Sequence, residues 1–552
     1  MDLARILETN FTSGATAFRL VSADGVHVEP CNHRRLLCVE PDALRHLARE
    51  AFRDISFLLR TPQLEQWAAI LDDPASSDND RFVAAALLRN AAISAEGVLP
   101  LCQDTGTATV VACKGEAMFT GVDDALHLEV GIREAYAGCN LRFSQVAPRS
   151  MFEEQNTRSN LPAQIEVYAA PGRQYRFLFV AKGGGSSNKT LLFQETKALL
   201  NENTLAQFLR EKVRALGVAA CPPYHLGLVV GGTSPELNLK LLKLATAGAL
   251  DHLPRAGDGA GQPYRDAAWE ARLVEIAAGT GLGAQFGGRH LALDARVIRC
   301  ARHAGSCPVS LGVSCSAHRN ALAYIDEQGV FREQLDANPA RFLPRALEVL
   351  DRRIGAPATA RIALDRPRAE ILAQLSRCPP GTLVLLSGPV VVARDAAHAR
   401  FYELLQAGRP LPEYLARHPV YYAGPAPTPA GRVIGSFGPT TAQRMDVYLP
   451  EFMARGFSLV TLAKGPRAAS VTAACREYGG FYLGTIGGAA ALIGQEHVVR
   501  DEVLDYADLG MEAVRRIEVR DLPAFILVDD QGKQLTPCAA LLAGCGRNPG
   551  PA

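Results

Sequence analysis

The stretch Leu226-Gly227-Leu228-Val229-Val230-Gly231-Gly232-Thr233-Ser234-Pro235-Glu236 predicts a strand, a glycine turn and the start of a helix. The apolar run is typical of a buried strand. Ser234 fits the N-cap of the following helix, and Pro235 fits its first helical position. The same order of strand, glycine-containing turn and helix recurs elsewhere in the chain. This alternation is the pattern of an α/β fold.

The first half of the chain carries further helix and strand patterns. Amphipathic periodicity predicts helices there, and short apolar runs bounded by glycine or proline predict strands. In chain order these are helices at 42–60 and 81–96, a strand at 108–112, a hairpin of strands 164–169 and 175–181 that turns at Pro171-Gly172, and a long helical stretch that ends near Ala215.

A second α/β pattern begins near residue 369. It contains strands at 383–386, 459–462 and 525–528, a Gly388-Pro389 turn after the first of them, and helices that begin near Asp395 and end near Tyr478. The preceding segment is rich in arginine, proline and alanine and has no strand pattern, so we interpret it as a helical linker. The sequence therefore predicts an N-terminal domain (1–332), a linker (333–368) and a smaller C-terminal domain (369–552).

Composition and charge argue against several classes of protein. The 552 residues are 48% hydrophobic and 21% charged, which is usual for a globular protein. Fifty-eight basic and 57 acidic residues give a net charge of +1, whereas a nucleic-acid or membrane-surface protein needs a basic excess. No apolar run reaches the roughly 18 residues of a membrane span, and the N-terminus lacks a signal-peptide pattern. We therefore expect a cytoplasmic protein without a nucleic-acid or membrane partner.

The thirteen cysteines are the unusual feature of the composition. An odd number in a long chain without a secretion signal argues against a disulfide scaffold, and no C-x-x-C pair is present. Either these residues are buried thiols, or some are ligands brought together from distant segments. Cys102, Cys221 and Cys315 have loop-like surroundings that suit an iron–sulfur cluster. Spacing alone does not separate them from Cys307 and Cys378, which each precede a proline.

Glycine-rich segments follow two of the predicted strands. Lys182 and Lys464 each precede glycines at a strand end, where open α/β sheets bind ligands, although a solvated turn lysine fits the same pattern. The segment Gly183–Thr190 resembles a phosphate loop, but Asn188 occupies the position of the required second glycine. A smaller anion, bound by backbone amides at a helix start, fits both this segment and Gly279–Gly281.

Three arginines stand in settings that suit recognition of a carboxylate. Arg142 lies in Asn140-Leu141-Arg142, Arg394 precedes Asp395, and Arg444 follows Thr440-Thr441-Ala442-Gln443. A guanidinium binds a carboxylate through two parallel hydrogen bonds, so several that converge on one cleft would suit a dicarboxylate. A surface charge is the alternative for each of them taken alone.

Together these segments resemble the class I fumarases, the iron–sulfur hydro-lyases. The resemblance covers about residues 30 to 535, and many matches in the same order are far more specific than any single pattern. The motifs are Cys102-Gln103-Asp104-Thr105-Gly106-Thr107, Asn140-Leu141-Arg142, Leu161-Pro162-Ala163-Gln164-Ile165, Lys182-Gly183-Gly184-Gly185-Ser186, Ala220-Cys221-Pro222-Pro223-Tyr224-His225, Gly283-Ala284-Gln285-Phe286-Gly287-Gly288, Arg302-His303, Val313-Ser314-Cys315-Ser316, Gly438-Pro439-Thr440-Thr441 and Ala463-Lys464-Gly465.

The resemblance implies a cofactor. Cys102, Cys221 and Cys315 would hold a [4Fe–4S] cluster through three of its irons, which selects among the cysteines where spacing does not. The fourth iron would bind the carboxylate and hydroxyl groups of the substrate and polarise both as a Lewis acid.

The resemblance also implies roles for other residues. Thr440, with Asp104 near it, matches the acid/base pair that removes the C3 proton of malate, and His303 matches a histidine close to the substrate. Positions that match the binding of the substrate carboxylates are Gln103, Arg142, Gly185, Arg394, Arg444 and Lys464. Cations around a carboxylate stabilise the carbanion-like state that forms when the adjacent carbon loses its proton.

The implied architecture is a two-domain α/β fold, with a large N-terminal cluster-binding domain and a smaller C-terminal domain. The C-terminal domain would supply Arg394, Thr440, Arg444 and Lys464, and the site would lie between the domains of each chain in a homodimer. Closure of the domains would then assemble the site and exclude water.

Two positions depart from the family pattern beside residues implied in substrate binding. Gln443 stands where fumarases usually have glycine, and Pro389 follows Gly388 where they usually have threonine. Fumarate and (S)-malate are the usual substrate pair of the family. The departures raise mesaconate and (S)-citramalate as a second pair, with dehydration of tartrate as an alternative, unless both changes are neutral at the rim of the pocket.

A function of another class fits the glycine loops. A non-catalytic protein would use them to hold a nucleotide or another anion, and its binding would depend on Lys189. The three cysteines separate the two hypotheses, because only the hydro-lyase needs them.

Overall fold

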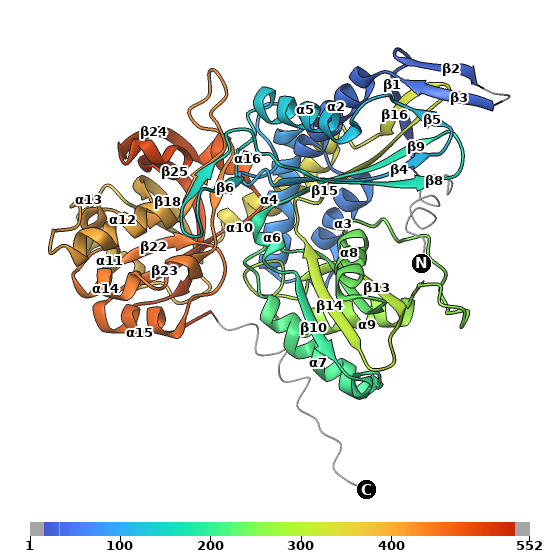
Figure 1. The fold of residues 1–552 in the computed structure, drawn as a ribbon. Helices are drawn as coiled ribbons and strands as arrows, with labels where there is room; N and C mark the ends of the chain where they lie inside the picture. Colours follow the sequence, from blue (N-terminus) through green and yellow to red (C-terminus); the bar gives the residue numbers. More distant parts are fainter. Residues whose placement is uncertain (1–15, 32–33, 536–552) are drawn as a thin grey trace, which may run out of the picture.

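The computed structural model describes residues 16–31 and 34–535, which form three large sheets with helices packed around them (Figure 1). The first sheet has six strands, in the order β1-β16-β15-β9-β4-β8. Their bounds are β1 (Phe18–Ser22), β16 (Gly329–Glu333), β15 (Arg319–Asp326), β9 (Tyr175–Lys182), β4 (Thr107–Gly115) and β8 (Gln164–Ala170). Helices α2 (Pro41–Phe57) and α5 (Asp124–Gly138) cover one face, where Phe52 of α2 packs against Phe179 of β9.

The second sheet has five strands, in the order β10-β14-β11-β13-β12. Their bounds are β10 (Leu191–Glu195), β14 (Cys307–Ser314), β11 (Tyr224–Gly232), β13 (Ala292–Arg302) and β12 (Tyr264–Arg265). Helices α7 (Glu202–Leu216) and α9 (Ala267–Ala278) pack on one face. Helix α8 (Pro235–Thr246) packs on the other face and also contacts the first sheet, so it holds the two sheets together.

The strand, turn and helix predicted for residues 226–236 form as expected. Strand β11 is buried along its whole length and leads through Gly231 and Gly232 into α8. The Ser234 hydroxyl accepts a hydrogen bond of 3.1 Å from the Leu237 amide, and Pro235 occupies the first turn. The N-cap and the proline thus fix where α8 begins.

The third sheet belongs to the C-terminal part and has seven strands, in the order β17-β18-β19-β22-β23-β25-β24. Their bounds are β17 (Ala360–Ala363), β18 (Leu383–Val392), β19 (Val420–Tyr421), β22 (Val460–Ala463), β23 (Phe481–Thr485), β25 (Val514–Val528) and β24 (Val498–Asp505). Helices α12 (Asp395–Gln406), α14 (Leu449–Ala454) and α15 (Ala469–Tyr478) pack on one face, and α11 (Arg368–Leu375) packs on the other.

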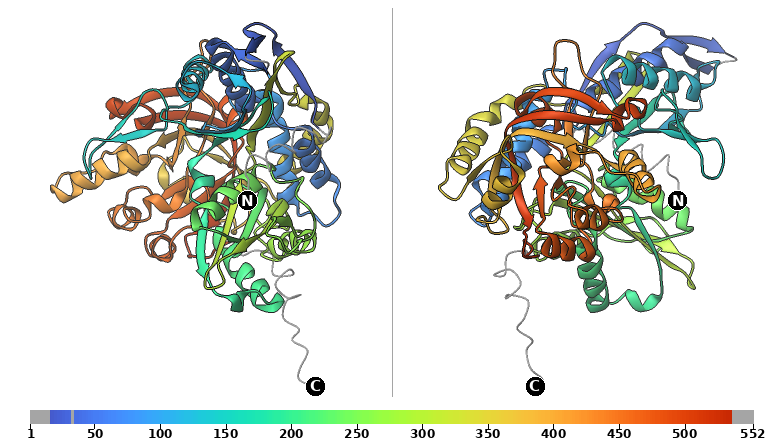
Figure 2. Two further views of the ribbon diagram at one scale, coloured as in Figure 1. Left: turned by 45° about the vertical axis from the view of Figure 1, so that its right-hand side comes forward. Right: turned by 90° about the vertical axis from the view of Figure 1, so that its left-hand side faces the viewer.

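A shared apolar cluster joins the two parts of the chain. It contains helices α3 (Thr61–Asp72), α4 (Asp78–Ser94) and α10 (Leu343–Ile354), together with Phe525 of β25. The Phe525 ring stacks on Phe286 at 4.2 Å between centroids and meets Phe82 of α4 edge-on at 5.9 Å. In both views of Figure 2, the second sheet (green) and the third sheet (orange and red) occupy different regions of the molecule.

A buried carboxylate determines the shape of the glycine-rich segment 279–288. Asp80, in the first turn of α4, forms a capping box with Ser77 and is fully buried. Its side chain accepts hydrogen bonds from the amides of Ala284 (2.7 Å) and Arg289 (2.9 Å). A Cβ on Gly288 would lie 2.0 Å from a carboxylate oxygen of Asp80, and the φ of Gly288 is +141°. The glycine is required because a side chain would occupy the place of the carboxylate.

Two sequence expectations for the first half are wrong. The strands at 164–169 and 175–181 do not form a hairpin with each other, because β4 lies between them, parallel to β8 and antiparallel to β9. The expected long helix that ends near Ala215 is a one-turn helix α6 (Gly184–Ser187), then strand β10, then α7. Local turn residues indicated a reversal of the chain but contain no information on which strand becomes the neighbour.

Further corrections concern helix and strand limits. The segment 333–368 contains α10, but it also contains strand β17, which pairs in parallel with β18. Gly388 and Pro389 do not end a strand; β18 runs through them with a register shift between Leu386 and Gly388. Helix α3 was not expected from the sequence, and α2 ends at Phe57. Within the described chain, none of the helices is both long and apolar enough to span a membrane.

Replacement of Gly288 by alanine tests the Asp80 arrangement. The new Cβ would displace the carboxylate and adopt an unfavourable φ, so we expect the free energy of unfolding to fall by roughly 1–3 kcal/mol. The shift of the urea unfolding midpoint measures this effect. Gly138→Ala is the control, since its Cβ would meet nothing within 4 Å and its φ is ordinary. Equal midpoints for the two variants would contradict the proposed role of Asp80.

Candidate active site

Three loops bring Cys102, Cys221 and Cys315 together. Cys102 precedes β4, Cys221 precedes β11, and Cys315 directly follows β14. The Ser316 amide donates a hydrogen bond of 3.0 Å to the carbonyl of Cys221, which joins two of the loops. Cys102 and Cys221 are buried and Cys315 is half-buried. Cys221 has a φ of +63°, in the left-handed region, because its chain turns sharply before β11.

The three thiols influence one another electrostatically. Burial raises the pKa of Cys102 to about 12, while Arg319 opposes this effect, and Asp104, Cys221 and Cys315 add to it. Burial also raises the pKa of Cys221, and Lys464 opposes it. The raised pKa values of Cys102 and Cys221 mean that a bound cation is needed to hold both as thiolates. The donor set therefore fits a soft metal centre.

Lys464 comes from the C-terminal part and contacts this group directly. It follows β22, and its Nζ donates a hydrogen bond of 2.8 Å to the Sγ of Cys221. Burial opposes the charge of Lys464, but Cys221, Cys102 and Cys315 together outweigh it and raise the pKa of the amine. The contact places an ammonium group against the sulfurs and joins the two parts of the chain.

Glycines allow the two parts to approach each other closely. A Cβ on Gly487 would lie 2.3 Å from the Sγ of Cys221, and one on Gly438 would lie 2.6 Å from the Oε1 of Gln103. Gln103 donates a hydrogen bond of 3.0 Å from Nε2 to the carbonyl of Pro439. A Cβ on Gly185 would lie 3.8 Å from the Nζ of Lys464, which is an ordinary contact.

Asp104 is an ionised carboxylate held by backbone amides. Its oxygens accept hydrogen bonds from Gly184 (2.8 Å) and Gly106 (3.1 Å). Burial opposes ionisation, but Arg142, Arg319 and the Gly184 amide outweigh burial and lower the pKa of Asp104. The amide at the start of α6 is therefore occupied by the protein's own carboxylate.

The two arginines Arg142 and Arg394 lie close to each other. Burial lowers the pKa of Arg142 to about 10, and the like charge of Arg394 adds to that effect. Arg394 donates a hydrogen bond of 2.7 Å to Glu512, whose second oxygen accepts one of 3.1 Å from the Ala396 amide. Arg394 is buried and Arg142 half-buried, and two guanidinium groups so placed repel each other unless an anion lies between or beside them.

Thr440 and Arg444 form the C-terminal edge of the site. Arg444 donates a hydrogen bond from Nη2 to the hydroxyl of Thr440 and forms an ion pair of 3.1 Å with Asp395. The amide of Thr440 donates to the carbonyl of Tyr422, and its carbonyl accepts from the amide of Lys464. These bonds fix the backbone on both sides of the Thr440 side chain.

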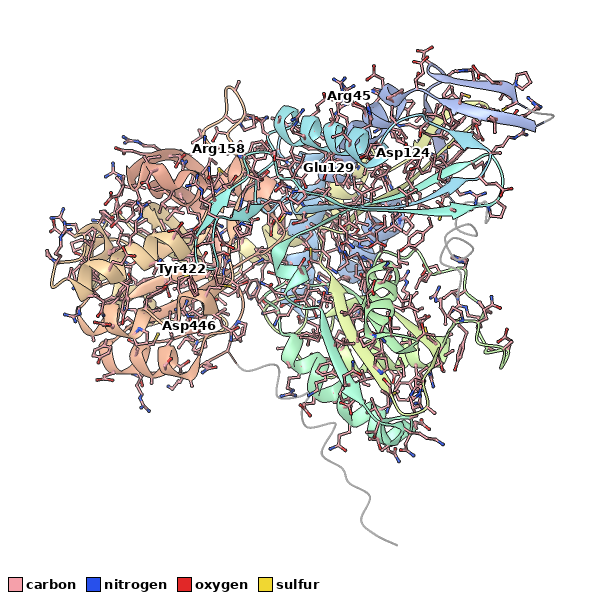
Figure 3. All side chains as sticks on the ribbon, in the orientation of Figure 1. Arg45, Asp124, Glu129, Arg158, Tyr422 and Asp446 are labelled. Atoms are coloured by element: carbon pink, nitrogen blue, oxygen red, sulfur yellow. The ribbon has the colours of Figure 1, made fainter. Side chains whose placement is uncertain are left out.

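A buried arginine supports this edge from behind. Tyr422 and Asp446 both lie in the C-terminal part (Figure 3). Arg467 joins them, with an ion pair of 2.9 Å to Asp446 and its guanidinium 5.2 Å from the centre of the Tyr422 ring. Tyr422 directly follows β19, so these contacts hold the end of β19 and, through the bond from the Thr440 amide to Tyr422, the backbone of Thr440.

Three residues named by the sequence stay outside the group of contacts just described. His303 lies exposed in the turn after β13, where its Nδ1 accepts a hydrogen bond from the Gly305 amide. Gln443 is exposed beside Arg444, and Pro389 pairs with Glu518 inside β18. Their roles remain predictions. Lys182 ends β9, and burial lowers its pKa to about 8.

The structure also adds residues that the sequence argument missed. Arg319 has only 3% of its surface exposed, and its Nε and Nη1 have no hydrogen-bond partner in the described part of the chain. Gln285 bonds Pro222 and Gly487, and so connects the Cys221 loop to the C-terminal part. Glu512 positions Arg394. Only Gln285 lay within a quoted motif; a single arginine or glutamate has no pattern that separates it from a surface charge.

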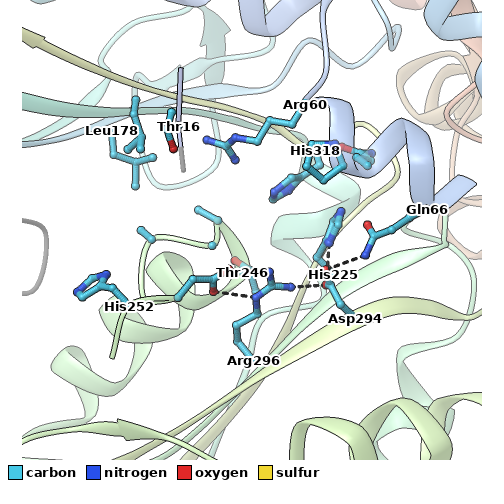
Figure 4. Close-up of a pocket in the computed structure, with 17 residues that line it drawn as sticks. Thr16, Arg60, Gln66, Leu178, His225, Thr246, His252, Asp294, Arg296 and His318 are labelled. Carbon is cyan, nitrogen blue, oxygen red and sulfur yellow. Dashed lines mark hydrogen bonds and ion pairs between the residues drawn. The ribbon is translucent and has the colours of Figure 1, made fainter. Parts of the chain in front are cut away.

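A cavity of about 530 Å³ lies behind the loops of Cys221 and Cys315 (Figure 4). It is lined by His225 and His318, whose ring centres are 4.2 Å apart, and by Asp294, which accepts a hydrogen bond of 2.7 Å from the His225 Nδ1. Gln63, on the same wall, donates to the carbonyl of Ser316. None of the three cysteines lines this cavity, so its residues support the loops from outside the site.

The comparisons with known proteins cover both parts of the chain. Residues 45–324 match the family model described as Fumarate hydratase (Fumerase), and residues 329–537 match the model described as Fumarase C-terminus. A two-part α/β fold with three clustered thiols and several buried cations, matched in both parts to these models, is that of a hydro-lyase enzyme.

Relatives align with almost the whole sequence. The anaerobic class I fumarate hydratase of Escherichia coli K12 is 52% identical over 517 residues, which is 94% of each chain. The aerobic class I enzyme of the same organism is 51% identical over 95% of this chain and 96% of its own. Fumarate hydratase 2 of Leishmania major is 50% identical over 94% and 91%. The chain therefore belongs to the class I fumarate hydratase family.

Gly487→Ala tests the close approach of the two parts. A methyl group 2.3 Å from the position of the Cys221 sulfur would separate Lys464 from the cysteines, so we expect hydro-lyase activity to fall at least about ten-fold. Gly184→Ala is the matched control at the same site, because its Cβ would make only an ordinary contact of 3.7 Å with Asp104. Steady-state rates of both variants measure the effect. Full activity of Gly487→Ala would contradict the requirement for close approach of Lys464 and Cys221.

Proposed function

We propose that the protein hydrates fumarate reversibly to (S)-malate in the pocket shared by its two parts. The observation that carries the proposal is the contact of the Lys464 ammonium with the Cys221 sulfur at 2.8 Å. It joins a metal-binding set of thiols from one part to the carboxylate-binding cations of the other. The names of the relatives support the same reaction.

We propose a [4Fe–4S] cluster as the resident cofactor, held by Cys102, Cys221 and Cys315. The three neighbouring thiols, two of them buried, and the adjacent ammonium of Lys464 fit such a group. When bound, the cluster supplies a Lewis-acidic iron for the carboxylate and hydroxyl groups of the substrate.

The cations of the pocket would bind the two carboxylates of the substrate. Arg142 and Arg394 lie close enough to depress the pKa of Arg142, so a carboxylate between them relieves their repulsion. Arg444, with 44% of its side chain exposed, stands nearer to solvent and suits the entering end of the substrate. Gln103, Gly185 and Lys464 complete the set. These charges stabilise negative charge that develops on the carboxylate next to C3.

Thr440 would take the proton from C3 of malate. Its hydroxyl oxygen already accepts a hydrogen bond from Arg444, and this positive group stabilises negative charge on that oxygen. Asp104 stays ionised in its cradle of amides and provides a fixed negative charge, while His303 is proposed to approach the substrate from its exposed turn. The bond from Gln103 to Pro439 closes the two parts over the pocket and restricts water.

Further parts of the proposal concern organisation. We propose a cluster-binding domain (1–332), a connecting segment (333–368) and a C-terminal domain (369–552), with β17 of the connecting segment added to the C-terminal sheet. We also propose that the protein is a homodimer in the cytoplasm. We propose that it does not bind nucleic acid, because its net charge is only +1.

Thr440→Val tests the proposed base. The variant keeps the size of the side chain and loses the hydroxyl, so we expect kcat for malate dehydration to fall by roughly 10²–10⁴-fold with little change in KM. Thr461→Val, a buried threonine of β22, is the control for the substitution itself. A Thr440→Val enzyme with near-normal kcat would exclude Thr440 as the base.

Removal of one cysteine tests the cofactor. Cys221→Ser should lose most of about four iron atoms per chain, its brown colour and its activity. Cys378→Ser, which changes a half-buried thiol outside the site, should keep all three. Iron analysis and visible absorption of anaerobically purified protein measure the effect. A colourless, metal-free wild-type protein that hydrates fumarate would rule the cluster out.

The exposed Gln443 beside Arg444 is the basis for proposing mesaconate as a second substrate. We expect Gln443→Gly to change the ratio of kcat/KM between mesaconate and fumarate by roughly ten-fold or more, which corresponds to the ~1–3 kcal/mol of a methyl-sized difference. Tartrate is measured in parallel as the alternative substrate. Pro389→Thr is expected to have less effect, since Pro389 lies within β18. If wild-type protein leaves mesaconate untouched, the interpretation of Gln443 is wrong.

A further inference from the structure

A small hairpin near the N-terminus carries a second cluster of metal-binding side chains. Strands β2 (Val26–Cys31) and β3 (Arg34–Val39) pair antiparallel, and β3 pairs with β5 (Met118–Phe119). Figure 1 shows this hairpin at the end of the molecule remote from the C-terminal part. It shares no residue with the site formed by Cys102, Cys221 and Cys315.

The register of the hairpin gathers these side chains on one face. Alternation along β2 places His27, Glu29 and Cys31 on the same side of the strand. Cys38 of β3 pairs directly with His27 across the ladder. The His27 Nε2 lies 3.1 Å from the Oε1 of Glu29, and a ligand atom from each of His27, Glu29 and Cys38 lies within 4.8 Å of the other two.

Their spacing is close to that of a tetrahedral zinc site. Bonds of about 2.0–2.3 Å from a metal to N, O and S ligands place those ligands roughly 3.3–3.8 Å apart. His27 and Glu29 are exposed side chains that can adjust by small rotations. Cys31 pairs with Arg34, four residues along β2 from His27, and so lies outside this set.

The chemistry of the donors indicates which metal they suit. One imidazole, one carboxylate and one thiol are ligands of Zn²⁺ and related thiophilic cations, whereas Mg²⁺ and Ca²⁺ prefer oxygen alone. We propose that His27, Glu29 and Cys38 form a separate binding site for a thiophilic divalent cation such as Zn²⁺, with solvent as the fourth ligand. Because the ligands come from both strands, the bound metal would hold the hairpin together.

Zinc binding to the whole protein tests this site. Wild-type protein with its iron content measured is dialysed against Zn²⁺, and zinc and iron are then determined on the same sample. We expect about one zinc per chain in addition to the iron, and a loss of affinity of at least about 100-fold in both His27→Ala and Cys38→Ser. Cys31→Ser should bind zinc as the wild type does, because Cys31 lies four residues along β2 from His27; binding at least ten-fold weaker there would contradict the proposed set of ligands.

Controls distinguish this site from the three-cysteine site. Cys378→Ser should bind zinc as the wild type does, and the hairpin variants should keep their iron and their activity, which also shows that they fold. Slower amide exchange across 34–39 on addition of Zn²⁺, absent in Cys38→Ser, is a second readout. Zinc that survives in His27→Ala and Cys38→Ser but is lost in Cys102→Ser would place the metal in the three-cysteine site and overturn the proposal.

Discussion

The contact between a half-buried ammonium and a buried sulfur is the constraint on which the active site depends. Lys464 and Cys221 come from different parts of the chain, and neither group is stable in the interior as an isolated charge. Their proximity requires Gly487 to lack a side chain, Gln285 to bond both neighbouring loops, and the Phe525 cluster to hold the sheets in position. The apolar contacts between the two parts thus serve to bring compensating charges within bonding distance.

Backbone amides in two glycine-rich loops donate hydrogen bonds to carboxylates of the chain itself. Asp80 accepts the amides of the 279–288 loop, and Asp104 accepts the amide that begins α6. In Asp104 the same amides keep a negative charge fixed beside Arg142 and Arg319, so one arrangement supports both the fold and the electrostatics of the pocket.

Sequence patterns predicted the local elements well and their neighbours poorly. Hydrophobic runs and caps located β11 and α8, because these signals act over a few residues. The insertion of β4 between β8 and β9 depends on contacts some sixty residues apart, which no turn residue encodes. In the site, the family motifs named the residues that the structure gathers around Cys221, whereas Arg319 and Glu512 lacked any distinguishing pattern. His303 lies apart from them in an exposed turn, and its role near the substrate remains a prediction.

The last strand has a consequence for how the protein is made. β25 occupies the interior of the third sheet, between β23 and β24, and it pairs with β18 as well. A ribosome releases the chain from its N-terminus, so the strands with the three cysteines can fold while the third sheet still lacks its central member. Lys464 then reaches Cys221 only after residue 528 has emerged. Until that point the Cys221 sulfur lacks its ammonium partner from the C-terminal part.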